Sequence, residues 1–386
     1  MLQLATVLKS KDFSITVAHA HFNSLDYSVF PDFTFLCIPD GLSEEEVQNP
    51  DLKAIMLRLN VNRESSLREY LARSTNHMGP GDKICCIIYD AVVYFLEAVA
   101  HDLKIPSIAS HTSSAAPTIV CPILLQLKAF RSQVHVEFLL FKLHLFLYSM
   151  LQAPVPLHQL LRFKDLPLSN FGSLDYFLEL VVLTSNMRSS LAIIFNTIHC
   201  LEESPLAQLY QRYQVPIFPI GPPHKLTPTS AQTHNSVQLE GVPQLLAHQN
   251  QDQLYEMAWG LANSRELFLW VIRPGSIPAP RKKVLAHEAV GGFWSHCGWH
   301  STLESICEGV LMICQPCFGD QKVNARYLTH EWRVGLELEG EIERRTIERA
   351  MRQRVLDLKH KCGFSIGDGG SSCHYLSELV GLLRSF

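Results

Sequence analysis

The residues whose types and spacing suit chemistry gather between positions 296 and 321. The run His296-Cys297-Gly298-Trp299-His300-Ser301-Thr302-Leu303-Glu304 follows a β-rich segment and opens a helical pattern. Backbone N–H groups at the start of a helix attract anions. We expect Ser301 to cap this helix and Gly298 to permit a close approach to the backbone. The run therefore predicts an anion site suited to a diphosphate.

Carboxylate and amide side chains stand at two further positions of the same region. Glu304 lies one turn further along the predicted helix, where it can accept hydrogen bonds from a ribose diol. Asp320 and Gln321 follow the next predicted strand, on the same carboxyl edge of a parallel sheet, and suit sugar hydroxyls. Each residue alone is more often a helix cap or a surface residue. Together they indicate a binding site.

A metal site is a second interpretation of the same segment, because histidines and cysteines also occur there. The residues concerned are His296, His300, Cys307, Cys314 and Cys317. The one Cys-x-x-Cys pair, Cys314 and Cys317, has no second pair at zinc spacing. We therefore expect no metal, and a metal-binding module is the least favoured alternative.

Alternating strand and helix patterns supply the elements that would position these residues. In the first half, strands are expected at 13–18, 84–89, 107–110 and 193–196. In the second half, strands are expected at 267–272, 290–295, 310–314 and 334–338, and helices at 254–262, 302–308, 321–330 and 342–361. The alternation is typical of parallel sheets with crossover helices and predicts two Rossmann-like halves, each of which begins on a helix.

A proline-rich segment at 215–223, followed by a polar stretch at 227–236, marks the expected domain boundary. We predict an N-terminal domain over 1–222, a linker over 223–240 and a C-terminal domain over 241–370. The remaining residues, 371–386, are expected to form a helix that packs back on the N-terminal domain.

Composition narrows the class of protein. A chain of 386 residues with 47% hydrophobic and 18% charged residues suits two α/β domains. The net charge of -4 gives no basic excess, so we expect neither nucleic acid nor an anionic membrane as a partner.

Cysteine usage and the apolar segments bear on location. The 11 cysteines and the absence of a targeting pattern at Met1 favour a reducing compartment, the cytoplasm. The most apolar stretch, 138–151, is interrupted by Lys142 and His144 and is shorter than the roughly 20 residues of a spanning helix. We expect a buried helix there.

Residues 284–321 resemble the secondary-product glycosyltransferase box of the plant UDP-dependent glycosyltransferases. The matching parts are Val284-Leu285-Ala286-His287, Ala289-Val290-Gly291, His296 to Ser305, Gly309-Val310, Gln315-Pro316 and Asp320-Gln321. Further segments are similar to the branch that includes cytokinin and benzoxazinoid glucosyltransferases. They are Met1 to Glu46, Cys86 to Pro117, Pro216 to Lys225, Met257 to Gly275 and Gly369 to Phe386.

The resemblance implies an α/β GT-B fold, with two Rossmann-like domains facing across a cleft. It implies transfer of a sugar, glucose by preference, from a UDP-sugar to a hydroxyl or amine of a small plant metabolite, with inversion at the anomeric carbon. The UDP-sugar is a co-substrate and no cofactor is implied. The expected acceptor is lipophilic or phenolic.

The resemblance also assigns roles to residues. His296 and Ser301 would hold the diphosphate, with Gly298 and His300 in the same turn. Glu304 would hold the ribose. The remaining contacts are to the sugar, from Trp299, Thr112, Asp320 and Gln321. Asp90 would orient a catalytic histidine.

The sequence departs from the family pattern at several of these places. The family base lies in a Gly-His-x-x-Pro turn just before the helix that here begins at Met1, and neither His19 nor His21 aligns with it. Pro278 stands in place of the tryptophan that stacks on uracil, Arg281 in place of a glutamine, His300 in place of an asparagine and Leu311 in place of a proline. We expect a truncated and internally deleted chain. The alternative function is an inactive relative that binds a ligand or partner without transfer.

Overall fold

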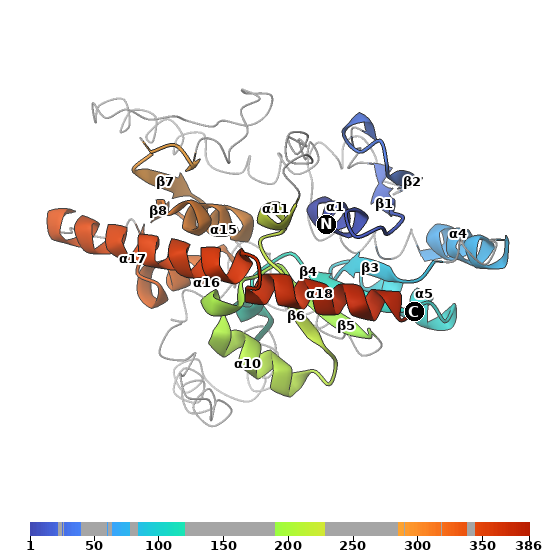
Figure 1. The fold of residues 1–386 in the computed structure, drawn as a ribbon. Coiled ribbons are helices and arrows are strands. Elements are labelled where there is room, and N and C mark those ends of the chain that lie inside the picture. The colour runs from blue at the N-terminus through green and yellow to red at the C-terminus, as the bar shows by residue number, and fades with distance from the viewer. Residues whose placement is uncertain are drawn as a thin grey trace, which may run out of the picture.

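The computed structural model describes residues 1–21, 25, 27–39, 60, 64–77, 84–119, 190–227, 285–288, 290–317, 319–337 and 344–386. In these ranges the strands form three parallel sheets, each with helices packed beside it (Figure 1). Several sequence predictions lie outside the described residues: the helix at 254–262, the strand at 267–272, the apolar stretch at 138–151, and Pro278 and Arg281.

The four-stranded sheet of the first half is built from buried parallel strands. They are β3 (Ile87–Asp90), β4 (Ser107–His111), β5 (Ala192–Phe195) and β6 (Ile217–Pro219), hydrogen-bonded in that order. Helix α5 (Phe95–Asp102) connects β3 to β4, and α10 (Glu203–Arg212) connects β5 to β6. The strands predicted at 84–89, 107–110 and 193–196 are therefore confirmed, with boundaries displaced by a few residues. Strand β6 falls inside the proline-rich segment and was not predicted.

A second, two-stranded sheet lies beside it. Strand β1 (Thr16–Ala20) pairs in parallel with β2 (Thr34–Ile38), so that Thr16 lies opposite Thr34. The prediction at 13–18 is confirmed, although the strand begins later. Within the described ranges no strand joins β1 to β3, which leaves two separate sheets. The first half begins, as predicted, on a helix, α1 (Leu2–Lys9), whose apolar positions Leu4, Val7 and Leu8 are buried.

The C-terminal sheet is β7 (Gly292–Ser295), β8 (Leu311–Cys314) and β9 (Gly335–Glu337), again parallel and in chain order. Helix α15 (Trp299–Glu308) connects β7 to β8. Helix α16 (Gln321–Arg326) continues into the π-helical turn η6 (Tyr327–Glu331) and leads to β9. The strands predicted at 290–295, 310–314 and 334–338 and the helices predicted at 302–308 and 321–330 are confirmed. The helix predicted at 342–361 is α17 (Arg344–Ile366).

The last helix, α18 (Ser371–Arg384), packs against the N-terminal sheet and α1 (Figure 1). Its buried residues share one apolar cluster with strands β4, β5 and β6 and with α1. On α18 they are Leu376, Leu379, Val380 and Leu383. At the beginning of the helix, the Ser372 hydroxyl donates to the carbonyl oxygen of Gly221 at 3.2 Å. The chain thus crosses from the C-terminal sheet back to the N-terminal core.

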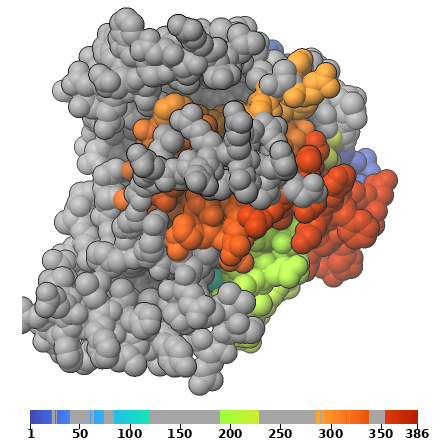
Figure 2. Space-filling model, turned by 90° about the vertical axis from the view of Figure 1, so that its left-hand side faces the viewer, coloured from blue at the N-terminus to red at the C-terminus, as the bar shows by residue number. Residues whose placement is uncertain are grey.

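The two halves also touch through their connecting segments. In Figure 2 the orange surface of the C-terminal segments lies directly beside the green surface of residues 190–227. The Trp332 indole N–H donates to the carbonyl oxygen of Leu201 at 3.2 Å, in the turn η4 (His199–Leu201). Lys225, in α11 (Pro223–Leu226), forms an ion pair with Glu308 at the end of α15. Residues 223–226 of the predicted linker are therefore helical.

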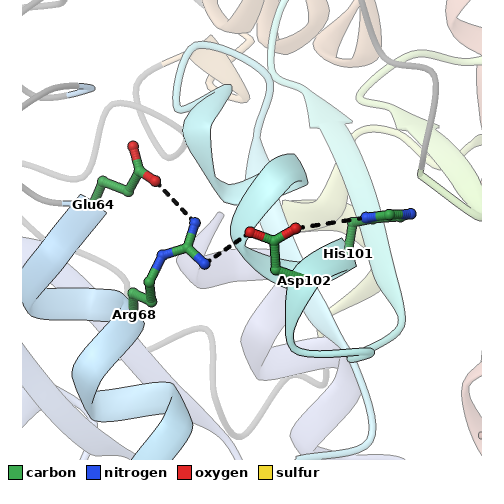
Figure 3. Close-up of polar contacts among 4 residues, drawn as sticks. All are labelled: Glu64, Arg68, His101 and Asp102. Carbon is green, nitrogen blue, oxygen red and sulfur yellow. Dashed lines mark hydrogen bonds and ion pairs between the residues drawn. The ribbon is translucent and has the colours of Figure 1, made fainter.

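An ion-pair network holds α4 (Glu64–His77) against the end of α5. The Arg68 guanidinium donates to Glu64 at 2.9 Å and to Asp102 at 2.8 Å, and His101 lies 3.8 Å from Asp102 (Figure 3). The pairs are partly exposed and compete with water, so they orient the two helices more than they stabilise the fold.

Candidate active site

The carboxyl edges of the N-terminal and C-terminal sheets face one another through direct hydrogen bonds. Asn196 follows β5, and its carbonyl oxygen accepts the indole N–H of Trp299 at 2.6 Å. The Asn196 side-chain amide nitrogen lies 3.3 Å from Nε2 of His300. Both partners lie in the first turn of α15, just beyond β7. Two predicted site residues of the C-terminal half, Trp299 and His300, therefore meet the N-terminal half at the end of β5.

The turn between β7 and α15 is short and strained. Cys297 has a positive φ of 63°, which is uncommon for a residue other than glycine, and strain of this kind gathers at functional sites. Gly298 is the N-cap residue, and the helix starts at Trp299 without a side-chain cap. The predicted capping role of Ser301 is therefore wrong, because the turn closes three residues earlier and places Ser301 inside the first helical turn.

The ring of His296 lies against the backbone of Gly298. A Cβ atom at Gly298 would stand 2.6 Å from Nε2 of His296, so any other residue here would have to displace the ring. The φ of Gly298 is −60°, so the reason for glycine here is space and not backbone conformation. This places an imidazole beside the backbone N–H groups that begin α15. A histidine and a helix start at one point form a suitable anion site.

Glu304 lies on α15 one turn after His300, so the two side chains share a face of the helix. Glu304 is only half-buried, whereas its neighbours Leu303 and Ser305 are buried in the core. The Glu304 carboxylate is therefore partly accessible, on the same face of α15 as His300.

Asp320 and Gln321 lie where β8 leads into α16. One Asp320 carboxylate oxygen accepts a hydrogen bond from the Asn324 amide at 3.1 Å. Burial raises the pKa of Asp320, and the Asn324 hydrogen bond acts in the opposite direction. The Gln321 side-chain oxygen accepts the backbone N–H of Cys317 at 2.8 Å, which fixes the loop ahead of the helix.

Asp90 and Thr112 are in contact at the carboxyl edge of the N-terminal sheet. The Asp90 carboxylate accepts the Thr112 hydroxyl at 3.3 Å and the Val92 N–H at 3.1 Å. Burial raises the pKa of Asp90. Asp90 is not a helix cap, because α5 begins only at Phe95. The ammonium group of Met1 interacts electrostatically with both Asp90 and His300, so the start of α1 lies at the same edge.

The side chains of Trp299, His19 and His21 make contacts within the fold. The Trp299 side chain is 4% exposed, with its ring 6.2 Å from that of Trp332. Trp299 therefore forms part of the contact between the halves. His19 bonds to the Tyr27 hydroxyl at 2.8 Å, and His21 lies 3.7 Å from the Cys37 sulfur, which gives both a local structural setting.

Sequence reasoning missed four polar residues that connect the site. Asn196, Ser114 and Asn324 bond across the two halves. The fourth, Glu202, accepts the N–H groups of Ala115 and Ala116 at 2.8 and 3.0 Å, where a helix begins after β4. Only Asn324 had a local signal, since it lies four residues after Asp320 and shares a helix face with it.

The described part of the chain also bears on metal binding and on membrane insertion. In that part, no three histidine, cysteine or acidic side chains are arranged to hold a metal ion. The helices described there include none with the length and apolar character needed to cross a membrane.

Comparison with known proteins decides the family. Residues 244–362 match the family model described as UDP-glucoronosyl and UDP-glucosyl transferase. The chain is 38% identical to UDP-glycosyltransferase 76E4 of Arabidopsis thaliana, over all of this chain and 95% of that protein. This chain belongs to the plant UDP-glycosyltransferases. Another relative of this glycosyltransferase is flavonol 3-O-glucosyltransferase UGT76E12 of Arabidopsis thaliana, 37% identical over 100% of this chain and 94% of that protein.

Solved structures of plant enzymes share the fold of this glycosyltransferase. Os79 of O. sativa in complex with UDP superposes with a TM-score of 0.78 at 20% identity, over 99% of this chain and 96% of that one. UGT71G1 of Medicago truncatula, complexed with UDP-glucose, gives 0.67 at 23% identity, over 99% and 94%. The GT-B fold expected from the box is thereby confirmed.

The relatives also bear on the expected internal deletion and on the expected branch of the family. The alignment with the 76E4 protein runs over 445 positions, more than the 386 residues of this glycosyltransferase, so the relative has residues that this chain lacks. Neither relative named here carries a cytokinin or benzoxazinoid in its name, and that branch stays a prediction.

Proposed function

We propose that this glycosyltransferase transfers glucose from UDP-glucose to a hydroxyl or amine of a small lipophilic or phenolic plant metabolite, with inversion. The observation that carries the proposal is the placement of His296 against Gly298 at the start of α15. The next residues of this helix contact Asn196 at the carboxyl edge of the N-terminal sheet. Asp90 and Thr112 lie at that same edge. A donor held at α15 would present its anomeric carbon toward the N-terminal sheet.

The donor contacts follow from residue type and position. In this proposal His296, Ser301 and the first N–H groups of α15 bind the diphosphate. A helix start favours an anion by roughly 0.3–1 kcal/mol at an exposed site. Glu304 accepts the ribose hydroxyls. Asp320 and Gln321 bind the hydroxyls of the sugar, since a carboxylate and an amide there match several donors and acceptors at once.

The chemical step needs stabilisation on both sides of the sugar. As the anomeric C–O bond breaks, negative charge grows on the UDP diphosphate, where His296 and the α15 dipole already lie. On the acceptor side the Asp90 carboxylate, fixed by Thr112 and Val92, would orient the family's histidine base and stabilise its positive charge; none of the 386 residues aligns with that base.

A second candidate is a relative that binds the donor without transferring sugar. The observation in its favour is that the 386 residues include no Gly-His-x-x-Pro motif, in which the family carries its base. General-base catalysis contributes roughly 10²–10⁴ in rate.

One experiment separates the two candidates. Purified chain is incubated with UDP-glucose and a panel of phenolic and cytokinin acceptors, and both released UDP and glucosylated product are measured. Product that Asp320→Ala abolishes supports transfer. Calorimetric binding of UDP-glucose with no product from any acceptor supports the second candidate, and no binding at millimolar UDP-glucose overturns both.

Acceptor class and location complete the proposal. One relative is named a flavonol glucosyltransferase, and UGT2 of Phytolacca americana was solved with pterostilbene, so phenolic acceptors head the panel. The ten cysteines in the described ranges are free thiols, which suits a reducing compartment, and we propose the cytoplasm.

A further inference from the structure

The side chain of Asn324 joins three segments that are far apart in the sequence. Its Oδ1 accepts the Ser114 hydroxyl at 3.1 Å, and its Nδ2 donates to the carbonyl oxygen of Cys297 at 3.0 Å and to Asp320 at 3.1 Å. Asn324 is 1% exposed. A buried amide with its oxygen and both N–H groups in use has one orientation only.

The three partners all belong to the site or to the opposite half. Cys297 lies in the strained turn between β7 and α15, and its carbonyl oxygen is held from α16. Ser114 precedes the helix that begins at Ala115, in the N-terminal half. Asp320 begins α16. The Asn324 amide therefore fixes the positions of the turn beside His296, the Asp320 carboxylate and Ser114 of the N-terminal half relative to one another.

The Asp320 carboxylate needs such support more than a surface carboxylate would. Burial favours its neutral form, and the Asn324 N–H is a hydrogen-bond donor that favours the ionised form. A half-buried carboxylate with a fixed donor on one oxygen is held in one direction.

We propose that Asn324 is a positioning residue for the donor sugar: it holds the Asp320 carboxylate, in register with the 296–298 turn, where it binds the sugar hydroxyls of the UDP-sugar. This inference deepens the proposed function and rests on it. Asn324 acts through Asp320 and does not touch the nucleotide. Its loss should therefore weaken recognition of the sugar more than recognition of UDP, which it affects only through the Cys297 contact.

The test compares two ligands that differ only by the sugar. Dissociation constants for UDP-glucose and for UDP are measured calorimetrically on wild type, Asn324→Ala and Asn324→Asp. The matched control is Thr329→Ala, because the Thr329 hydroxyl donates to the Ala325 carbonyl oxygen at 2.8 Å, just beyond α16 and without contact to Asp320. For Asn324→Ala we expect UDP-glucose affinity to fall about tenfold, the size of one charge-assisted hydrogen bond, with a clearly smaller loss for UDP.

Asn324→Asp, which keeps the size of the side chain, adds a second measurement: the direction in which UDP-glucose affinity changes with pH. This variant also keeps the inference testable if Asn324→Ala fails to fold. In Asn324→Asp the introduced carboxylate faces Asp320, and like charges repel. When the introduced group is protonated it can donate one hydrogen bond to Asp320. UDP-glucose affinity of this variant should therefore recover as the pH falls from 8 to 5.5. In Asn324→Ala no such recovery is expected, because the alanine side chain can neither repel Asp320 nor donate to it.

The outcomes separate the inference from the proposed function. Equal loss of UDP and UDP-glucose in the Asn324 variants, or no change in either, overturns the positioning role. A shifted ratio in Thr329→Ala as well would mean that the helix as a whole is sensitive, which also overturns it. Failure of the wild-type chain to bind either ligand would instead overturn the proposed donor site.

Discussion

Three carboxylates at or near the site are largely removed from water and also accept hydrogen bonds. Asp90, Glu202 and Asp320 have raised pKa values because the surrounding protein disfavours their charged forms, and each accepts hydrogen bonds that act the other way. Asp90 and Asp320 keep part of their surface accessible, whereas Glu202 is fully enclosed. The first two are thus available to a ligand, and the third serves the fold.

Glu304→Ala should weaken UDP binding about tenfold, because a carboxylate that accepts hydrogen bonds from both ribose hydroxyls is lost. Calorimetric titration with UDP measures the effect. Glu378→Ala, which removes an exposed carboxylate on α18, serves as the control and should bind UDP like wild type. Unchanged affinity in Glu304→Ala would remove the ribose role from this residue.

Cys200 should be alkylated at lower pH than an ordinary thiol. A hydrogen bond from Cys362, with a further one from Ser365, lowers its pKa below that of an ordinary thiol against the opposing effect of burial. The thiolate is the reactive form, so the rate of iodoacetamide labelling should rise with a midpoint below that of free cysteine, and Cys362→Ala should move that midpoint upward. Burial raises the pKa of Cys86 to about 12, so its labelling at pH 7.5 should be far slower. Mass spectrometry of peptides follows both sites.

The predicted site residues are close together in the sequence, whereas those that were missed come together only in the folded structure. His296, Gly298, Glu304 and Asp320 belong to one short stretch whose types and order can be recognised without a fold. The Ser114 to Asn324 bond spans 210 positions, and it exists only because two sheets face each other. No local pattern carries that information.

At the scale of elements, hydrophobic alternation predicted most strands of the described part, but it placed the start of α15 too late. The error came from treating Ser301 as the cap, since serine is a favoured cap residue. The start is fixed instead by the short turn and by the ring of His296 over Gly298, which are tertiary features. Strand β6 was missed because it has three residues and ends on Pro219, a poor strand residue.

Leu379→Ala should destabilise the protein by about 2–5 kcal/mol, the usual cost of a cavity at a buried leucine. Leu379 is 0% exposed and lies in the cluster that α18 shares with α1 and the N-terminal sheet. Urea unfolding followed by circular dichroism measures the change. Leu356→Ala, at a position 43% exposed on α17, is the control and should change stability little.

The whole molecule places its binding elements between two halves that are tied together at several points. Those ties include the bonds from Trp299 to Asn196, from Trp332 to Leu201 and from Ser114 to Asn324. A ligand bound where they meet contacts the folded state alone, so binding and folding are coupled.

UDP should therefore stabilise the folded chain in proportion to its affinity. At a concentration 100 times the dissociation constant, the gain is about 2.7 kcal/mol, and the melting temperature should rise with ligand concentration. Differential scanning fluorimetry with UDP from micromolar to millimolar gives the curve. Glu304→Ala should need about tenfold more UDP for the same shift. A flat curve for the wild-type chain would contradict a UDP site.

The return of α18 to the N-terminal core also fixes an order of events during synthesis. Domains generally fold as units while the chain is still being made, N-terminal first. Here the cluster around Leu4, Ile194 and Phe218 is completed by residues from Leu376 to Leu383, close to the end of the chain. This cluster of the N-terminal half cannot be completed before α18 has been synthesised. Until then the apolar residues that α18 covers on α1, β5 and β6 lack that cover.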